Sequence, residues 1–188
     1  RQWQLPDDPY YLFVGTFQPR KNLDRILAAY AALPSPVRRQ HPLVIVGREG
    51  WACEATVARL RGLQQAGEAV HWIQGLRDRD TLRAIYAGAA ALVFATLHEG
   101  FGIPVLEAFA SRAPVITSNT TSLPEVAGDA ALLVDPTDVE AISHAMQRLA
   151  EDAELADDLR ERGWQRAGEF RWSATATELA KVYRKLAG

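Results

Sequence analysis

The sequence is poor in several features that would each define a class of protein. Its single cysteine, Cys53, excludes a disulfide framework and a cysteine-based zinc site. A formal net charge of -2 provides no basic surface for nucleic acid, so we expect no nucleic-acid partner. No apolar run approaches the roughly 20 residues of a membrane-spanning helix, and we find no signal peptide. These absences favour a cytoplasmic protein without a transmembrane segment; attachment of a longer form to the inner face of the membrane stays open.

Two further absences concern ligands. The loop after the first apolar run lacks the G-x-G-x-x-G fingerprint, because no second glycine follows Gly15 at the required spacing. Binding of a nicotinamide cofactor is therefore disfavoured. The four histidines are scattered without the spacing of metal ligands, so we expect no metal site.

What is present is the composition of a globular chain, with 48% hydrophobic and 23% charged residues in 188. Short apolar runs alternate with segments of helical periodicity, which predicts an α/β fold with a Rossmann-like, doubly wound parallel sheet of about six strands. We expect strands at residues 10–14, 43–46, 70–73, 89–95, 114–117 and 131–134. We expect helices at residues 23–33, 54–66, 81–87, 104–110, 139–149, 154–166 and 173–186. Ligands of such sheets bind at the carboxyl ends of the strands, where the strand order reverses.

Three helix starts carry recognisable signals. Asn22 is a good N-cap for the first helix, and Asp80 is a candidate cap for the helix at 81–87. Pro104 suits the first position of its helix, because the N–H that proline lacks has no partner there. After the strand at 114–117 we expect a polar loop over residues 118–122, followed by a short turn through Pro124.

The stretch from 97 to 110 is the strongest candidate for a binding site. A buried strand, a loop with Gly100 and Gly102, and a helix N-terminus together favour phosphate binding, because free N–H groups and the helix dipole point outward. Glu107 lies one turn into a helix that is otherwise nearly all apolar, where a carboxylate needs partners. Sugar hydroxyls would serve, but an exposed helix face or an ion pair with an arginine explains Glu107 equally well.

Arg20 and Lys21 stand just before the first helix. The planar guanidinium of an arginine can donate two parallel hydrogen bonds, and beside the compact charge of a lysine it suits a diphosphate. A solvated basic loop is the alternative, and it is the better explanation if the pair is taken alone.

Three segments in this order resemble the retaining family 4 glycosyltransferases of the GT-B fold. Glu99 and Glu107, separated by seven residues with Gly-Phe-Gly after the first, resemble that family's E-x7-E motif. Residues 14–22 and 122–131 carry the other two segments. The resemblance implies that residues 1–170 form the C-terminal, donor-binding domain of such an enzyme. It also implies that residues 171–188 form a helix that crosses to an N-terminal acceptor domain outside this sequence.

The resemblance further implies a role for individual residues. Glu99 would be the catalytic residue, facing the transferred sugar, and Glu107 would bind the ribose. Arg20 and Lys21 would bind the diphosphate. Thr16 stands where many relatives have arginine, so a third cationic contact is not expected. The other nucleotide-sugar-binding residues would be Gly15, Thr16, Gly75, Leu76, Gly100, Phe101, Gly102 and Ile103.

The implied reaction is transfer of a sugar, such as mannose from GDP-mannose, to an acceptor such as a growing glycan or a lipid-linked acceptor, with retained anomeric configuration. The nucleoside diphosphate sugar is then a substrate, and neither a cofactor nor a metal is expected. Two alternatives stay open: a nucleotide-sugar epimerase of similar fold, and a non-catalytic nucleotide-binding module. A glycosidase also pairs two carboxylates, but Glu107 on an apolar helix beside phosphate-type loops fits that poorly.

Overall fold

The computed structural model describes residues 5–187 and confirms the predicted fold class. Six parallel strands form one sheet in the order β3-β2-β1-β4-β5-β6. The strand order reverses between β1 and β4, which is the position where Rossmann-like sheets bind ligands. The strands are β1 (Tyr10–Val14), β2 (Leu43–Val46), β3 (Val70–Ile73), β4 (Ala89–Phe94), β5 (Val115–Ser118) and β6 (Leu132–Val134).

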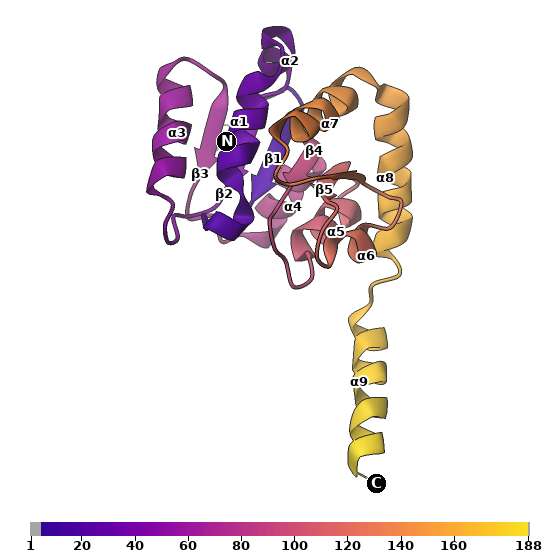
Figure 1. Cartoon of the computed structure of the whole chain (residues 1–188). Helices are drawn as coiled ribbons and strands as arrows, with labels where there is room; N and C mark the ends of the chain where they lie inside the picture. The colour runs from indigo at the N-terminus through magenta and orange to yellow at the C-terminus, as the bar shows by residue number, and fades with distance from the viewer. Residues whose placement is uncertain (1–4, 188) are drawn as a thin grey trace.

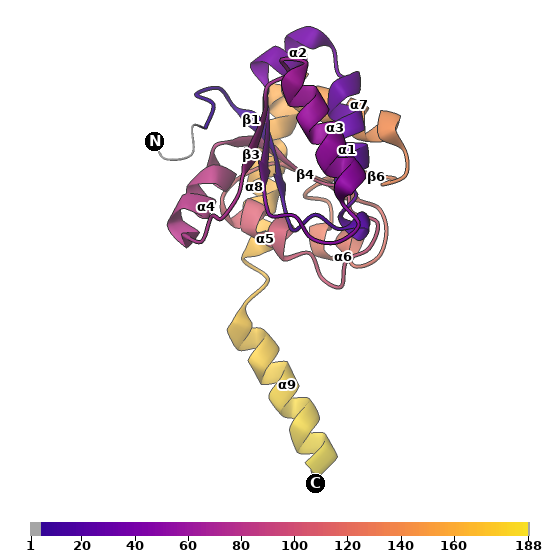
Figure 2. The same cartoon turned by 90° about the vertical axis from the view of Figure 1, so that its left-hand side faces the viewer.

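Helices cover both faces of the sheet (Figures 1 and 2). The helices are α1 (Leu23–Ala32), α2 (Ser35–Gln40), α3 (Glu54–Gln65), α4 (Arg79–Ala87), α5 (Ile103–Ala110), α6 (Leu123–Ala127), α7 (Val139–Glu151), α8 (Ala153–Ala167) and α9 (Trp172–Ala187). One buried cluster joins α1, α3 and α7 to one face, and a second joins α4, α5 and α6 to the other. Helix α8 packs against α5 and α7. Such two-sided burial explains why the strands read as continuous apolar runs.

Several local predictions need correction. The side chain that caps α4 is Asp78, which accepts the amide of Thr81, so the prediction of Asp80 is wrong. Helix α5 begins at Ile103, which places Pro104 at its second position. The expected turn through Pro124 is the short helix α6. In the first two cases the predicted position was off by one or two residues, and in the third the turn continues into a helix of five residues.

Asn22 occupies the N-cap position of α1, but its side chain does not cap the helix. Its backbone is left-handed, with φ 59°, and its Nδ2 donates to the carbonyl oxygens of Ala95 and Pro136, each at 2.7 Å. The amide thus ties the start of α1 to the segments that follow β4 and β6.

Helix α9 extends away from the rest of the molecule (Figure 1). Its large apolar side chains are exposed: Trp172, Leu179, Val182, Tyr183 and Leu186. None of the helices in the described part combines the length and the apolar character that crossing a bilayer requires.

Candidate functional site

The loops after β1 and β4 meet at the reversal point of the sheet. The amide of Leu97 donates to the carbonyl of Arg20 at 2.8 Å, and the Arg20 guanidinium donates to the carbonyl of His98 at 3.3 Å. These bonds join segments far apart in the sequence. The two loops in which the sequence places diphosphate-binding and sugar-binding residues therefore lie side by side.

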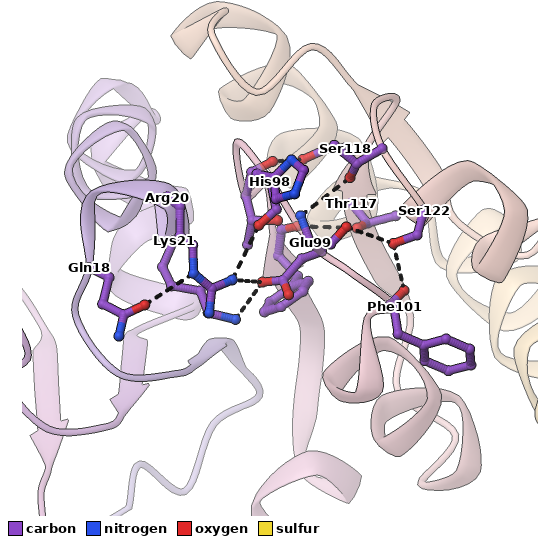
Figure 3. A network of polar contacts seen from close by, with 12 residues as sticks. Gln18, Arg20, Lys21, His98, Glu99, Phe101, Thr117, Ser118 and Ser122 are labelled. Atoms are coloured by element: carbon purple, nitrogen blue, oxygen red, sulfur yellow. Dashed lines mark hydrogen bonds and ion pairs between the residues drawn. The ribbon is translucent and has the colours of Figure 1, made fainter.

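Glu99, Lys21 and Arg20 form an ion cluster at this point (Figure 3). Glu99 Oε1 lies 3.3 Å from Arg20 Nη1 and accepts a hydrogen bond from Lys21 Nζ. The Glu99 and Lys21 side chains are only 10% and 11% exposed, whereas Arg20 is half-exposed. Lys21 Nζ also lies 5.0 Å from the centre of the Phe94 ring, within the range of a cation–π contact. The sequence predicted that these residues share one site, but it did not predict that Glu99 pairs with both cations.

The loop of residues 99–102 leads directly into α5. Gly102 is the N-cap and has φ 111°, a backbone conformation that favours glycine. Within residues 5–187, no hydrogen bond runs from the amides of residues 100–103 to another protein group. These N–H groups at a helix N-terminus can therefore donate to an anion. Phe101 and Ile103 expose their side chains beside them, and the Phe101 ring meets Phe170 edge-on at 6.0 Å.

A separate cavity of about 500 Å³ opens at the carboxyl ends of β1, β2 and β3, beside the start of α4. Four predicted site residues line it: Gly15, Thr16, Gly75 and Leu76. Arg48, Arg77 and Arg79 add positive charge to its wall, and the Asp78 carboxylate is held by Thr81. The backbone is so closely packed here that a Cβ on Gly47 would lie only 2.0 Å from the carbonyl oxygen of Gly15.

Glu107 lies neither in the ion cluster nor among the cavity-lining residues. Its partner is the buried Tyr86, whose hydroxyl donates to Glu107 Oε2 at 2.9 Å. Burial, and then the charge of Glu107, raises the pKa of Tyr86 well above its ordinary value, so the phenol stays protonated and keeps donating. The second oxygen, Oε1, accepts no hydrogen bond from residues 5–187. Neither an arginine ion pair nor a fully exposed face describes this carboxylate.

Sequence reasoning missed the polar groups that hold the loop of residues 99–102. The Ser122 hydroxyl bonds to the carbonyl oxygens of Glu99 and Phe101, at 3.1 and 3.0 Å. The Thr121 hydroxyl accepts the amide of Glu99 at 3.4 Å. The polar composition of residues 118–122 was the available signal, but it does not reveal a partner more than 20 residues away.

His98 is exposed and contributes its carbonyl, not its ring, to the contacts with Arg20. The residues that the structure describes contain no group of three or more His, Cys, Asp or Glu side chains that could hold a metal ion.

The sheet order and the helix N-terminus at the reversal point define a Rossmann-like domain of the kind found in GT-B glycosyltransferases. Residues 1–166 match the family described as glycosyl transferases group 1, and the chain belongs to that family.

Individual relatives agree with this assignment. The O-antigen chain mannosyltransferase B of Escherichia coli is 39% identical over 191 residues, covering 99% of this chain and 48% of that protein. The serotype-specific mannosyltransferase WbdA of Escherichia coli is 31% identical over 175 residues, covering 93% of this chain and 21% of that protein. The structure of sucrose-phosphate synthase from Thermosynechococcus elongatus matches with a TM-score of 0.82 and 33% identity, covering 98% of this chain and 47% of that one.

The chain thus spans half or less of the length of these relatives. The matches do not favour an epimerase or a non-catalytic module.

Proposed function

We propose that this chain is the donor-binding domain of a retaining glycosyltransferase of family 4, which binds a nucleoside diphosphate sugar at the reversal point between β1 and β4. The observation that carries the proposal is the ion cluster of Arg20, Lys21 and Glu99 beside the open amides of residues 100–103. Two cations and a helix N-terminus suit a diphosphate, and a carboxylate suits sugar hydroxyls.

The nucleoside would extend from this ion cluster toward the cavity at the ends of β1, β2 and β3. Its base would enter the cavity near Gly75 and Leu76, and its diphosphate would lie against Gly15 and Thr16 on the way to Lys21. Glu107 would accept the ribose hydroxyls through Oε1, with Tyr86 fixing the other carboxylate oxygen.

Glu99 would act on the sugar, and the two cations would stabilise the diphosphate as it leaves. Charge develops on that diphosphate as the glycosidic bond breaks, and groups already in place stabilise it without rearrangement. We propose that no metal ion is needed, because Arg20, Lys21 and the α5 amides supply the positive charge.

We propose mannose, carried by GDP, as the transferred sugar. Two of the relatives above bear the name mannosyltransferase, and one of these bears the name O-antigen chain mannosyltransferase. A growing glycan or a lipid-linked glycan is the corresponding acceptor. A second domain would hold the acceptor, and the exposed apolar side chains of α9 would pack against that domain.

Calorimetric titration of the purified chain with GDP-mannose, GDP, UDP-glucose, UDP and guanosine tests this function. We expect GDP-mannose and GDP to bind, guanosine to bind far more weakly, and the uracil nucleotides to bind less well than their guanine counterparts. We also expect no sugar transfer by this chain alone, because catalysis requires both substrates in register. Absence of binding by every nucleoside diphosphate would refute the proposal, and robust transfer by the chain alone would refute the role given to a second domain.

A further inference from the structure

Ser122 occupies the N-cap position of α6 but does not cap that helix. A serine at this position ordinarily accepts a hydrogen bond from an amide in the first turn of its own helix. Here the hydroxyl instead bonds to the carbonyl oxygens of Glu99 and Phe101, at 3.1 and 3.0 Å, and its single proton is shared between them. The side chain is therefore committed to the loop of residues 99–102 and not to its own helix.

The neighbours of Ser122 contact the same loop. Thr121 holds a left-handed backbone, with φ 59°, which is costly for a β-branched residue, and its hydroxyl accepts the amide of Glu99. On the other side, a Cβ on Gly102 would lie 2.7 Å from Leu123 Cδ2, so α6 packs directly on the loop. Three consecutive residues, 121–123, thus brace residues 99–102.

The geometry of the peptide bond gives this brace a consequence for the site. In a planar trans peptide the carbonyl and the N–H of the next residue point in opposite directions. Ser122 holds the carbonyls of Glu99 and Phe101, so the N–H groups of Gly100 and Gly102 are directed away from it. Figure 3 shows Ser122 on one side of Glu99, and Arg20 and Lys21 on the other.

We propose that Ser122 is a positioning residue for the donor's diphosphate. By fixing two peptide planes, its hydroxyl orients two amides toward the anion and keeps the Glu99 backbone in place beside the cations. This inference rests on the proposed function, since it assumes that a nucleoside diphosphate binds at the ion cluster.

The test compares the variants S122A and S122T, with S111A as a matched control. Ser111 lies at the opposite end of α5, and its hydroxyl makes no hydrogen bond within residues 5–187. We expect S122A to weaken GDP binding about five- to tenfold, the effect of one lost ordinary hydrogen bond. Guanosine binding should not change. S122T restores the hydroxyl and should recover most of the affinity, and S111A should match the wild type.

The readouts separate positioning from a general structural role. A fold-wide defect would weaken GDP and guanosine binding alike and would not be rescued by threonine, so that pattern overturns the inference. Equal GDP affinity in S122A and the wild type also overturns it, while the proposed function stands. Failure of the wild type to bind GDP overturns both. If S122A is too unstable to titrate, S122G removes the same hydroxyl at a position where glycine is tolerated.

Discussion

Replacing Glu99 by glutamine should strengthen binding of a nucleoside diphosphate while weakening the contribution of the sugar. The motif alone predicts that Glu99 affects only the affinity contributed by the sugar and leaves binding of the nucleoside diphosphate unchanged. The structure adds that Glu99 is the counter-ion of both Arg20 and Lys21, so in the free domain its carboxylate competes with a diphosphate for the same cations.

The expected size follows from the charges. One carboxylate charge and two phosphate charges about 6 Å apart repel by roughly 1.4 kcal/mol in a water-like dielectric, which corresponds to about a tenfold gain in GDP affinity for E99Q. Lys21 is nearly buried, so loss of its counter-ion should cost the free domain about 1–3 kcal/mol. A protein of this size loses about 2–4 °C in Tm per kcal/mol, so we expect a fall of roughly 2–12 °C.

Calorimetry with GDP and GDP-mannose, combined with thermal unfolding, measures both effects. E99Q should bind GDP more tightly than the wild type, gain more Tm from saturating GDP, and show a smaller ratio of GDP-mannose to GDP affinity. E125Q is the control, because it removes an exposed carboxylate from the first turn of α6. Unchanged or weaker GDP binding by E99Q would refute the competition between carboxylate and diphosphate.

Five further variants probe other parts of the site and the backbone beside it. K21A and R20A should each weaken GDP binding tenfold or more by calorimetry and leave guanosine binding nearly unchanged, since a charge-assisted contact contributes about 1.5–3 kcal/mol; equal losses for both ligands would contradict this. E107Q should weaken the binding of GDP and of guanosine to the same extent, and Y86F should weaken both less strongly. If E107Q changes the unfolding midpoint but neither affinity, Glu107 is a structural charge and not a ligand of the ribose. G47A should unfold at a markedly lower denaturant concentration than the wild type, because its Cβ has no room beside a carbonyl oxygen 2.0 Å away; an unchanged midpoint would contradict that.

The sequence by itself predicted the six strands and the longer helices, and it marked the central loop as the candidate site, but it did not predict the short helices α2 and α6. Each strand is short, apolar and followed by a loop, and Tyr10–Val14 and Leu43–Val46 were predicted to the residue because burial on both faces leaves no polar interruption. The glycines around Phe101 and the proline that follows marked a helix N-terminus beside Glu99. These signals are local, since they depend on neighbours within one turn or one strand.

Only the tertiary structure decided which side chains meet. Lys21 and Glu99 are 78 positions apart, and nothing in either neighbourhood specifies that they pair. Glu107 could equally have met an arginine, until the fold placed the Tyr86 hydroxyl beside it. Asn22 was predicted to cap a helix and Ser122 to lie in a polar loop, yet both side chains bond to distant carbonyls. A polar side chain binds the partner that the packed sheet and helices bring within about 3 Å, and strand order and helix packing fix that partner.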